Sequence, residues 1–317
     1  MNNKEKYRAF CIKELGIPIF IKDWWLDAVC GKVGWDVAIV EKGGEIVGCL
    51  PYCLRSRKGF KVIYLPKLTQ TMGPFIKYPE SQKCDTRLAY EKEIFSSLTD
   101  QLPEVAHFCQ SFNYSITNWL PFYWKGFRQT TRYTYVIESL ENLDSIWKNF
   151  SANLRNEIRK AEKLVVAKTS SDLDSFYKLN KMTFDRQNLT IPYSFDFIAN
   201  LDNVCAANNC RRIFFAFDSQ NRIHAAIYLI WDSNSAYYLM GGGDPELRNS
   251  QAASLLMWEA IKFSATVTKK FDFEGSMIES VERFCRSFGT VQKPYFQIFR
   301  TSSKVYKLLN GLREILR

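Results

Sequence analysis

The chain has 317 residues, of which 46% are hydrophobic and 15% aromatic, so it is long enough for two domains with buried cores and is not a disordered chain. Its longest apolar runs, such as residues 225–231, are far shorter than the roughly 20 residues that a membrane-spanning helix needs. The net charge of +10 favours anionic ligands such as phosphates, RNA or a lipid pyrophosphate, with a solvated basic surface as the alternative.

The cysteines and the first residues of the chain indicate in which cellular compartment the protein lies. Nine cysteines at scattered spacings and only two histidines disfavour a metal site and are typical of free thiols in a reducing cytoplasm. The first residues carry charges with no apolar segment behind them, so we expect no signal peptide. We therefore predict a cytoplasmic protein without a metal or a transmembrane segment, with peripheral contact at the inner membrane face as an alternative.

In the first half of the chain, the spacing of apolar residues predicts a mixture of helices and strands. The tight turn Lys42-Gly43-Gly44 joins the first two strands as a hairpin. The predicted elements are helices over residues 21–30 and 86–101, and strands over residues 35–41, 45–54, 61–66, 106–112 and 132–137.

The second half contains more elements in a similar arrangement. Ser151 is the expected N-cap of one helix, and Ser171 opens another. The predicted helices cover residues 151–163, 173–187, 194–208, 279–287 and 303–316, with one more starting after Ser250. The predicted strands cover residues 165–169, 212–217, 223–231, 236–240, 270–273 and 295–300.

This order of elements predicts an α+β fold with mostly antiparallel central sheets flanked by helices, rather than a doubly wound parallel sheet. Neither the Gly-x-Gly-x-x-Gly pattern nor the Walker lysine motif is present. Dinucleotide redox chemistry and nucleotide hydrolysis are therefore disfavoured.

Residues 237–259 carry the most informative pattern in the chain. A strand that runs through three glycines into the start of a helix presents backbone N–H groups and the positive end of a helix dipole, where phosphates bind. We therefore predict a cofactor site formed by Met240, Gly241, Gly242, Gly243, Arg248, Asn249, Ser250, Gln251 and Ala252.

The candidate catalytic residues are two carboxylates and a tyrosine. Asp272 and Glu274 alternate with phenylalanines on a predicted strand, so both should point to one side, where burial can prepare a general base. Tyr238 could donate a proton to a leaving thiolate. The alternatives are a strand-end capping or ion-pairing role for the carboxylates and ordinary core packing for the tyrosine.

Basic residues suggest where an anionic substrate binds. Arg155 and Arg159 form a stripe on one helix, and two stretches of the chain, between Glu45 and Glu80 and between Glu282 and Glu314, contain cations and no acid. We predict a substrate-binding role for Arg155, Arg159, Arg286 and Tyr295, against the alternative of a solvated face. Cys285 and His224 are expected to be structural, because a thiol in an apolar helix is more often packed than reactive.

Four segments resemble the Fem-like branch of the GNAT acyltransferase superfamily, which includes the aminoacyltransferases of peptidoglycan bridges. These segments are LPKLTQTMGP at residues 65–74, LRNEIRKAE at residues 154–162, the strand, glycines and helix of residues 238–258, and FDFEG at residues 271–275 followed by FCRSFG at residues 284–289. The resemblance implies two GNAT-like domains in tandem, a degenerate one over residues 1–138 and an acyltransferase domain over residues 139–317. It also implies an acetyl-CoA or other acyl-CoA donor.

Two departures from the family pattern affect the expected function. Cys285 stands where members that use charged tRNA typically have a lysine, which argues against a tRNA partner, and the turn at residues 248–253 lacks the usual glycines. We expect a CoA-dependent acyltransferase acting on an amine or hydroxyl acceptor, such as a small molecule or a cell-envelope precursor. The alternatives are an aminoacyl-tRNA-dependent transferase acting on lipid II and an inactive GNAT fold that binds RNA or an anionic precursor.

Overall fold

The computed structural model describes residues 2–275 and 277–315. The chain forms two compact units, one made of Met1–Arg132 with Pro294–Arg317 and the other of Tyr133–Lys293. The strand β6 (Arg128–Ile137) leads from the first unit into the second, and β12 (Val291–Thr301) leads back. This division differs from the predicted one because β12 pairs with β5 (His107–Ser111), which places the C-terminal segment with the first unit.

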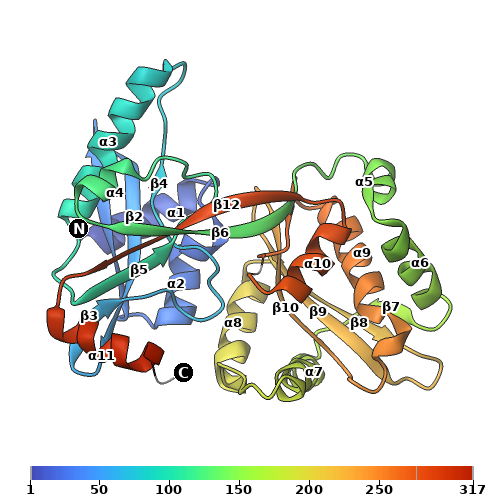
Figure 1. Ribbon diagram of the computed structural model, residues 1–317. Helices are drawn as coiled ribbons and strands as arrows, with labels where there is room; N and C mark the ends of the chain where they lie inside the picture. Colours follow the sequence, from blue (N-terminus) through green and yellow to red (C-terminus); the bar gives the residue numbers. More distant parts are fainter. Residues whose placement is uncertain (1, 276, 316–317) are drawn as a thin grey trace. The chain divides into compact units, whose positions relative to one another are not determined.

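The first unit is a sheet with helices on it (Figure 1). Its strands follow the order β1-β2-β3-β5-β12, and β4 pairs with β2 outside this path. Residue Leu316 of the predicted C-terminal helix lies outside the described residues. The remaining elements are α1 (Asn3–Lys13), η1 (Ile19–Ile21), α2 (Asp23–Cys30), β1 (Trp35–Lys42), β2 (Glu45–Arg57), β3 (Phe60–Ile63), β4 (Phe75–Ile76), α3 (Cys84–Asp100), α4 (Leu120–Trp124) and α11 (Lys304–Ile315).

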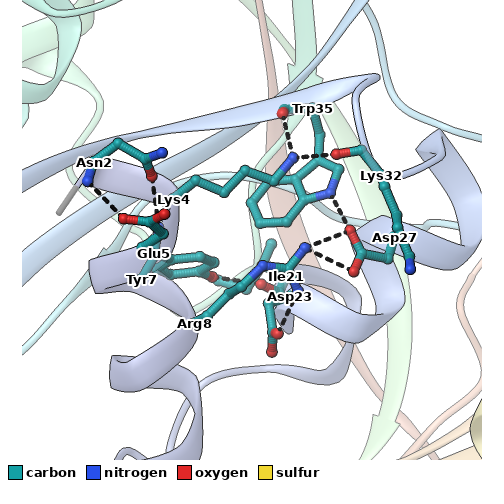
Figure 2. A network of polar contacts seen from close by, with 10 residues as sticks. All are labelled: Asn2, Lys4, Glu5, Tyr7, Arg8, Ile21, Asp23, Asp27, Lys32 and Trp35. Atoms are coloured by element: carbon teal, nitrogen blue, oxygen red, sulfur yellow. Dashed lines mark hydrogen bonds and ion pairs between the residues drawn. The ribbon is translucent and has the colours of Figure 1, made fainter.

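The helix α1 is held on the first unit by a polar network (Figure 2). The Asn2 side chain accepts from the backbone N–H of Glu5 at 2.9 Å, and the Glu5 carboxylate accepts from the backbone N–H of Asn2. Each side chain thus satisfies a backbone N–H group of the other residue at the start of the helix. Arg8 donates to both oxygens of Asp27 and to Asp23. Beneath this network α1 buries apolar side chains, including Tyr7 and Phe10.

The second unit contains a mixed sheet in the order β6-β11-β10-β9-β8-β7. All of its pairs are antiparallel except β10 with β11. Its other elements are α5 (Leu143–Asn149), α6 (Ala152–Ala161), β7 (Val166–Thr169), α7 (Leu173–Arg186), α8 (Phe195–Ala207), β8 (Arg211–Phe217), β9 (Ile223–Trp231), β10 (Ala236–Gly243), η2 (Arg248–Ser250), α9 (Ala252–Ser264), β11 (Phe271–Asp272) and α10 (Glu279–Ser287).

The core of the second unit explains why β9 and α9 are so apolar in sequence. Ile227 and Leu229 of β9 and Leu256 and Ile261 of α9 are each at most 2% exposed and belong to one cluster. A strand at the centre of a sheet and a helix laid across it are both covered, so neither needs a polar face. This packing fixes the start of α9 next to the end of β10.

In the part of the chain that the structure describes, none of the helices is both long and apolar enough to cross a membrane.

Candidate functional site

The site begins where two neighbouring strands separate. The parallel strands β10 and β11 pair over two residues, Ala236 with Phe271 and Tyr237 with Asp272, whereas β10 continues to Gly243. A register shift in β10 between Tyr238 and Met240 accompanies the separation. The glycine end of β10 therefore extends beyond its short partner, where backbone groups can meet a ligand.

The helix α7 supports this end of β10. The Asn180 side chain donates to the carbonyl of Gly241 at 2.7 Å, and Thr183 Oγ1 accepts from the N–H of Gly243 at 3.2 Å. A Cβ on Gly242 would lie 2.4 Å from backbone atoms of Leu179 and Asn180, so only glycine permits this approach. Part of the glycine run therefore serves helix packing rather than a ligand directly.

A pocket of about 400 Å³ opens beside these glycines, within the range of small-molecule sites. Of the predicted cofactor residues, it is lined by Gly241, Gly242, Gly243, Arg248, Gln251 and Ala252. The pocket lining does not include Met240, Asn249 or Ser250. Met240 is buried at 5% exposure, and Ser250 is buried and bonds with its neighbours.

The start of α9 forms one wall of the pocket. Gln251 directly precedes the helix and has φ +59°, a left-handed conformation that glycine adopts most easily. In the pattern of the family that the sequence resembles, this position is a glycine. Among the described residues no side chain caps α9, and both Ala252 and Ala253 line the pocket. Backbone donors of a first helical turn without a side-chain cap are suited to binding an anion.

Two arginines bring positive charge to the same pocket, whose lining also contains the carboxylates of Glu157 and Asp244. Arg248 comes from η2, and Arg186 comes from the last turn of α7. Both are exposed, and within residues 2–275 and 277–315 neither forms an ion pair. Sequence reasoning missed Arg186 because it lies far from the glycines in the chain; its spacing of three from Thr183 on one helix face is the signal that could have indicated it.

His224 also lines the pocket, although it was expected to be structural. Its Nδ1 lies 2.8 Å from Ser250 Oγ and its Nε2 lies 3.1 Å from Asp218 Oδ2. The Ser250 hydroxyl also donates to the carbonyl of Leu247 at 2.8 Å. His224 thereby links β9 to η2 and positions the turn that leads into α9.

The two carboxylates lie together, next to β10. Asp272 accepts hydrogen bonds from the Thr134 hydroxyl and, at 2.8 Å, from the backbone N–H of Glu274. The strand β11 ends at Asp272, and Glu274 adopts φ +56°, so the strand alternation expected from the sequence does not continue to Glu274. Neither residue is part of the pocket lining; Asp272 lies opposite Tyr237, the neighbour of Tyr238.

Burial changes the protonation of this pair. Burial raises the pKa of Asp272 to about 6, although its bonds from Thr134 and Glu274 lower it. Burial, and then the charge of Asp272, raise the pKa of Glu274 well above its usual range. The charge of Asp272 is one cause of the raised pKa of Glu274, so Asp272 is the member of the pair that ionises first as pH rises. This favours Asp272 over Glu274 as the proton acceptor.

Tyr238 is the one predicted catalytic residue that lines the pocket. Its hydroxyl lies against Gly241, because a Cβ added there would be 2.0 Å from it. Burial, and then the nearby Cys285, raise the pKa of Tyr238, so the phenol keeps its proton. Burial also raises the pKa of Cys285 to about 12, and a thiol with such a pKa is a poor nucleophile.

The predicted substrate-binding residues lie outside the pocket lining. Arg155 donates to the carbonyls of Lys148 and Phe150, Arg159 lies 5.9 Å from the Trp147 ring, and Arg286 pairs with Glu282 at 3.4 Å. Tyr295 belongs to the first unit, where Gln70 donates to its hydroxyl at 3.3 Å. Within the described residues, no group of three or more histidines, cysteines or carboxylates could hold a metal ion.

Comparisons with known proteins support these assignments of fold. Residues 148–276 match the family model of an acetyltransferase (GNAT) domain. FemX has a similar fold, with a TM-score of 0.69 and 13% identity over 93% of this chain and 96% of that protein. L-PGS from Bacillus licheniformis aligns with a TM-score of 0.56 and 13% identity over 99% of this chain and 97% of that chain. No curated protein matches the sequence significantly.

The predicted α+β fold of GNAT type is confirmed by these likenesses and by the sheets of the two units. The matched segment contains the strands β7 to β11, the helix α9 and most of the pocket lining. The site described above therefore lies almost entirely in the segment that matches the GNAT domain model.

Proposed function

We propose that this member of the GNAT superfamily transfers an acyl group from a coenzyme A thioester to an amine or hydroxyl acceptor. The observation that carries the proposal is the pocket between the glycine end of β10 and the start of α9. It combines a strand that extends past its partner, an exposed helix start and two arginines.

The pocket residues fit the phosphate part of coenzyme A. The left-handed Gln251 turns the chain so that α9 starts at the pocket wall, and the first-turn N–H groups of Ala252 and Ala253 are donors for a pyrophosphate. Arg186 and Arg248 add guanidinium groups that bind phosphate in two-point fashion. Coenzyme A, when bound, would supply the activated acyl group as a thioester.

The residues near β10 have chemistry that suits direct transfer. The protonated phenol of Tyr238, next to Gly241, can donate a proton to a leaving thiolate. Backbone N–H groups of β10 near residues 240–242 are candidate donors to the oxyanion of a tetrahedral intermediate. Asp272 ionises before Glu274 as pH rises, so it is the better candidate to accept the acceptor's proton.

The acceptor is proposed from the fold alone. FemX and L-PGS share the fold, and the resemblance of the sequence to Fem-like enzymes points to an acceptor in cell-envelope biosynthesis. Cys285, buried and protonated, replaces the lysine expected of a tRNA-dependent member. The proposed donor is therefore acyl-CoA rather than aminoacyl-tRNA.

Calorimetric titration of the full chain with acetyl-CoA and with bulk tRNA tests the donor. The decisive variant is Ala253→Glu, because Ala253 is exposed in the first turn of α9 and lines the pocket. A carboxylate there should lower the affinity for acetyl-CoA at least about tenfold through repulsion of the phosphates.

Ala152→Glu is the matched control, because Ala152 is exposed in the first turn of α6, outside the pocket lining. It should leave the affinity for acetyl-CoA unchanged. The proposal fails if Ala253→Glu binds acetyl-CoA as tightly as the unchanged protein, or if tRNA binds and acetyl-CoA does not.

A further inference from the structure

The fold brings together the two acid-free basic stretches found in the sequence. One contributes the turn between β2 and β3, and the other contributes the helix α11, both in the first unit (Figure 1). The contact is specific: the ring of Tyr306 lies 5.5 Å from the ring of Phe60, and Lys58 donates to the carbonyl of Leu309 at 3.4 Å. The Tyr306 hydroxyl is 3.1 Å from that of Tyr64.

Tyr306 determines which side of α11 faces the unit. It is 0% exposed and lies against Phe60 and His107, with centroid distances of 5.5 and 5.7 Å. Val305 and Leu308, three residues apart on the same helix, are 58% and 67% exposed. Within residues 304–309, the helix thus buries the aromatic ring of Tyr306 and presents Val305 and Leu308 to solvent.

Four lysines lie on the same helix as these two aliphatic side chains and on the turn beside it. Lys304 and Lys307 of α11 and Lys58 and Lys61 of the turn are all exposed, and in the part of the chain that the structure describes none of the four forms an ion pair. One acid on a segment that contacts the start of α11 is Glu104, two residues before Ala106, whose carbonyl accepts from the backbone N–H groups of Ser302 and Ser303. The local charge is therefore strongly positive.

We propose that this face, formed by residues 57–61 and 304–308, binds the surface of an anionic phospholipid bilayer. The lysines would meet the headgroup phosphates, and Val305 and Leu308 would enter the boundary between headgroups and acyl chains. An exposed pair of aliphatic side chains on the same segments as lysines without ion pairs fits a surface that is anionic outside and apolar just beneath.

The same cations could attract RNA, but the rest of the face does not suit it. Binding of single-stranded RNA draws on exposed aromatic rings for base stacking, whereas here Tyr306 is buried and Phe60 packs against it. Nucleic acid would also leave Val305 and Leu308 without an apolar partner. The bilayer is therefore the occupant that uses both the charges and the aliphatic side chains.

The test is co-sedimentation of the full chain with vesicles of phosphatidylcholine alone and of phosphatidylcholine mixed with phosphatidylglycerol. We expect binding to the mixed vesicles that weakens as salt rises. Lys304→Gln combined with Lys307→Gln should weaken it about 25-fold, since each cation near an anionic surface contributes about fivefold. Val305→Ser combined with Leu308→Ser should weaken it about tenfold.

The control is Lys160→Gln combined with Lys163→Gln, which removes the same charge from exposed positions at the end of α6 and should change binding less than twofold. Because all four substituted side chains are exposed, the thermal midpoint of unfolding should not change in either double variant. If a double variant lowers this midpoint, the single change Lys304→Gln replaces the lysine pair, or Leu308→Ser replaces the aliphatic pair. No binding to mixed vesicles, equal loss in the control, or no effect of the serine variant would overturn the proposal. So would displacement of the protein from vesicles by low concentrations of tRNA.

Discussion

Replacing Asp272 by asparagine should separate the catalytic role of this carboxylate from its effect on stability. The Asp272 side chain is buried at 5% exposure and its pKa rises from 3.8 to about 6, because burial disfavours the charged form. Each pKa unit corresponds to about 1.4 kcal/mol, so the ionised group lowers the free energy of unfolding by about 3 kcal/mol above pH 6.

The direction of the pH effect follows from this shift. Below about pH 3 Asp272 is protonated in both the folded and the unfolded chain and imposes no penalty. Between about pH 4 and pH 6 the folded chain holds the proton more tightly than the unfolded chain, so the stability that the group contributes falls as pH rises. The variant Asp272→Asn lacks this titration, and its stability should be flatter across the same interval.

Urea unfolding at a series of pH values measures this difference. Asparagine can still accept from Thr134 and from the N–H of Glu274, but its amide needs a partner of its own, at a cost of about 1–3 kcal/mol if none forms. That cost is constant with pH, so the change in the stability difference between pH 3 and pH 7 reports the charge of Asp272 together with its effect on the neighbouring Glu274. We expect that change to be about 3 kcal/mol in favour of the variant.

Asp185→Asn is the control, because the Asp185 carboxylate is 58% exposed and its removal should leave the pH dependence unchanged. Once an acceptor is known, Asp272→Asn should also lower turnover by about 10²-fold or more, while the affinity for acetyl-CoA stays the same. Parallel pH profiles of the unchanged protein and Asp272→Asn would refute the electrostatic argument. Full turnover in the variant would refute the assignment of the base.

Two further predictions concern the pocket. Gly242→Ala should destabilise the protein by about 1–3 kcal/mol or more, because the new methyl group would meet the α7 backbone at 2.4 Å. Gly243→Ala is the control and should destabilise it less, because the nearest atom to its methyl group would be 3.2 Å away. Equal thermal midpoints for the two variants would contradict this packing. Arg186→Ala and Arg248→Ala should each weaken acetyl-CoA binding about fivefold, with a smaller effect at high salt, as measured by calorimetry. The exposed Arg128→Ala serves as their control, and an equal loss there would show a general charge effect instead.

Much of the fold could be predicted from local patterns. The hairpin of β1 and β2 follows from Gly43 and Gly44, both of which have positive φ in the structure. The proposed phosphate site could be predicted from the sequence as a strand, glycines and a helix start, because all three are consecutive in the chain. The helix α1 was missed because its sequence is polar and weakly periodic, although Asn2 and Glu5 have the spacing of a capping box.

What could not be predicted depends on contacts between distant segments. The contribution of Arg186 to the pocket arises because α7 packs on β10, and the separation of β10 from β11 depends on how far the two strands pair. The alternation of Asp272 and Glu274 suggested that both face one side, with Glu274 as the leading candidate base, but the turn at Glu274 and the burial of both carboxylates favour Asp272 instead. The sequence alone does not show how far these carboxylates are buried or how close each lies to the charge of the other.

The return of the chain to its first unit has a consequence for synthesis. The strand β5 is made early, but its partner β12 comes only after the whole of residues 133–293. At roughly 5–20 residues per second, the ribosome needs on the order of ten seconds or more to make that segment. During this interval the nascent first unit has an open sheet edge at β5, a feature prone to wrong pairing. Cellular factors that shield nascent chains should therefore matter more for this part of the protein than for the second unit, which is continuous in sequence.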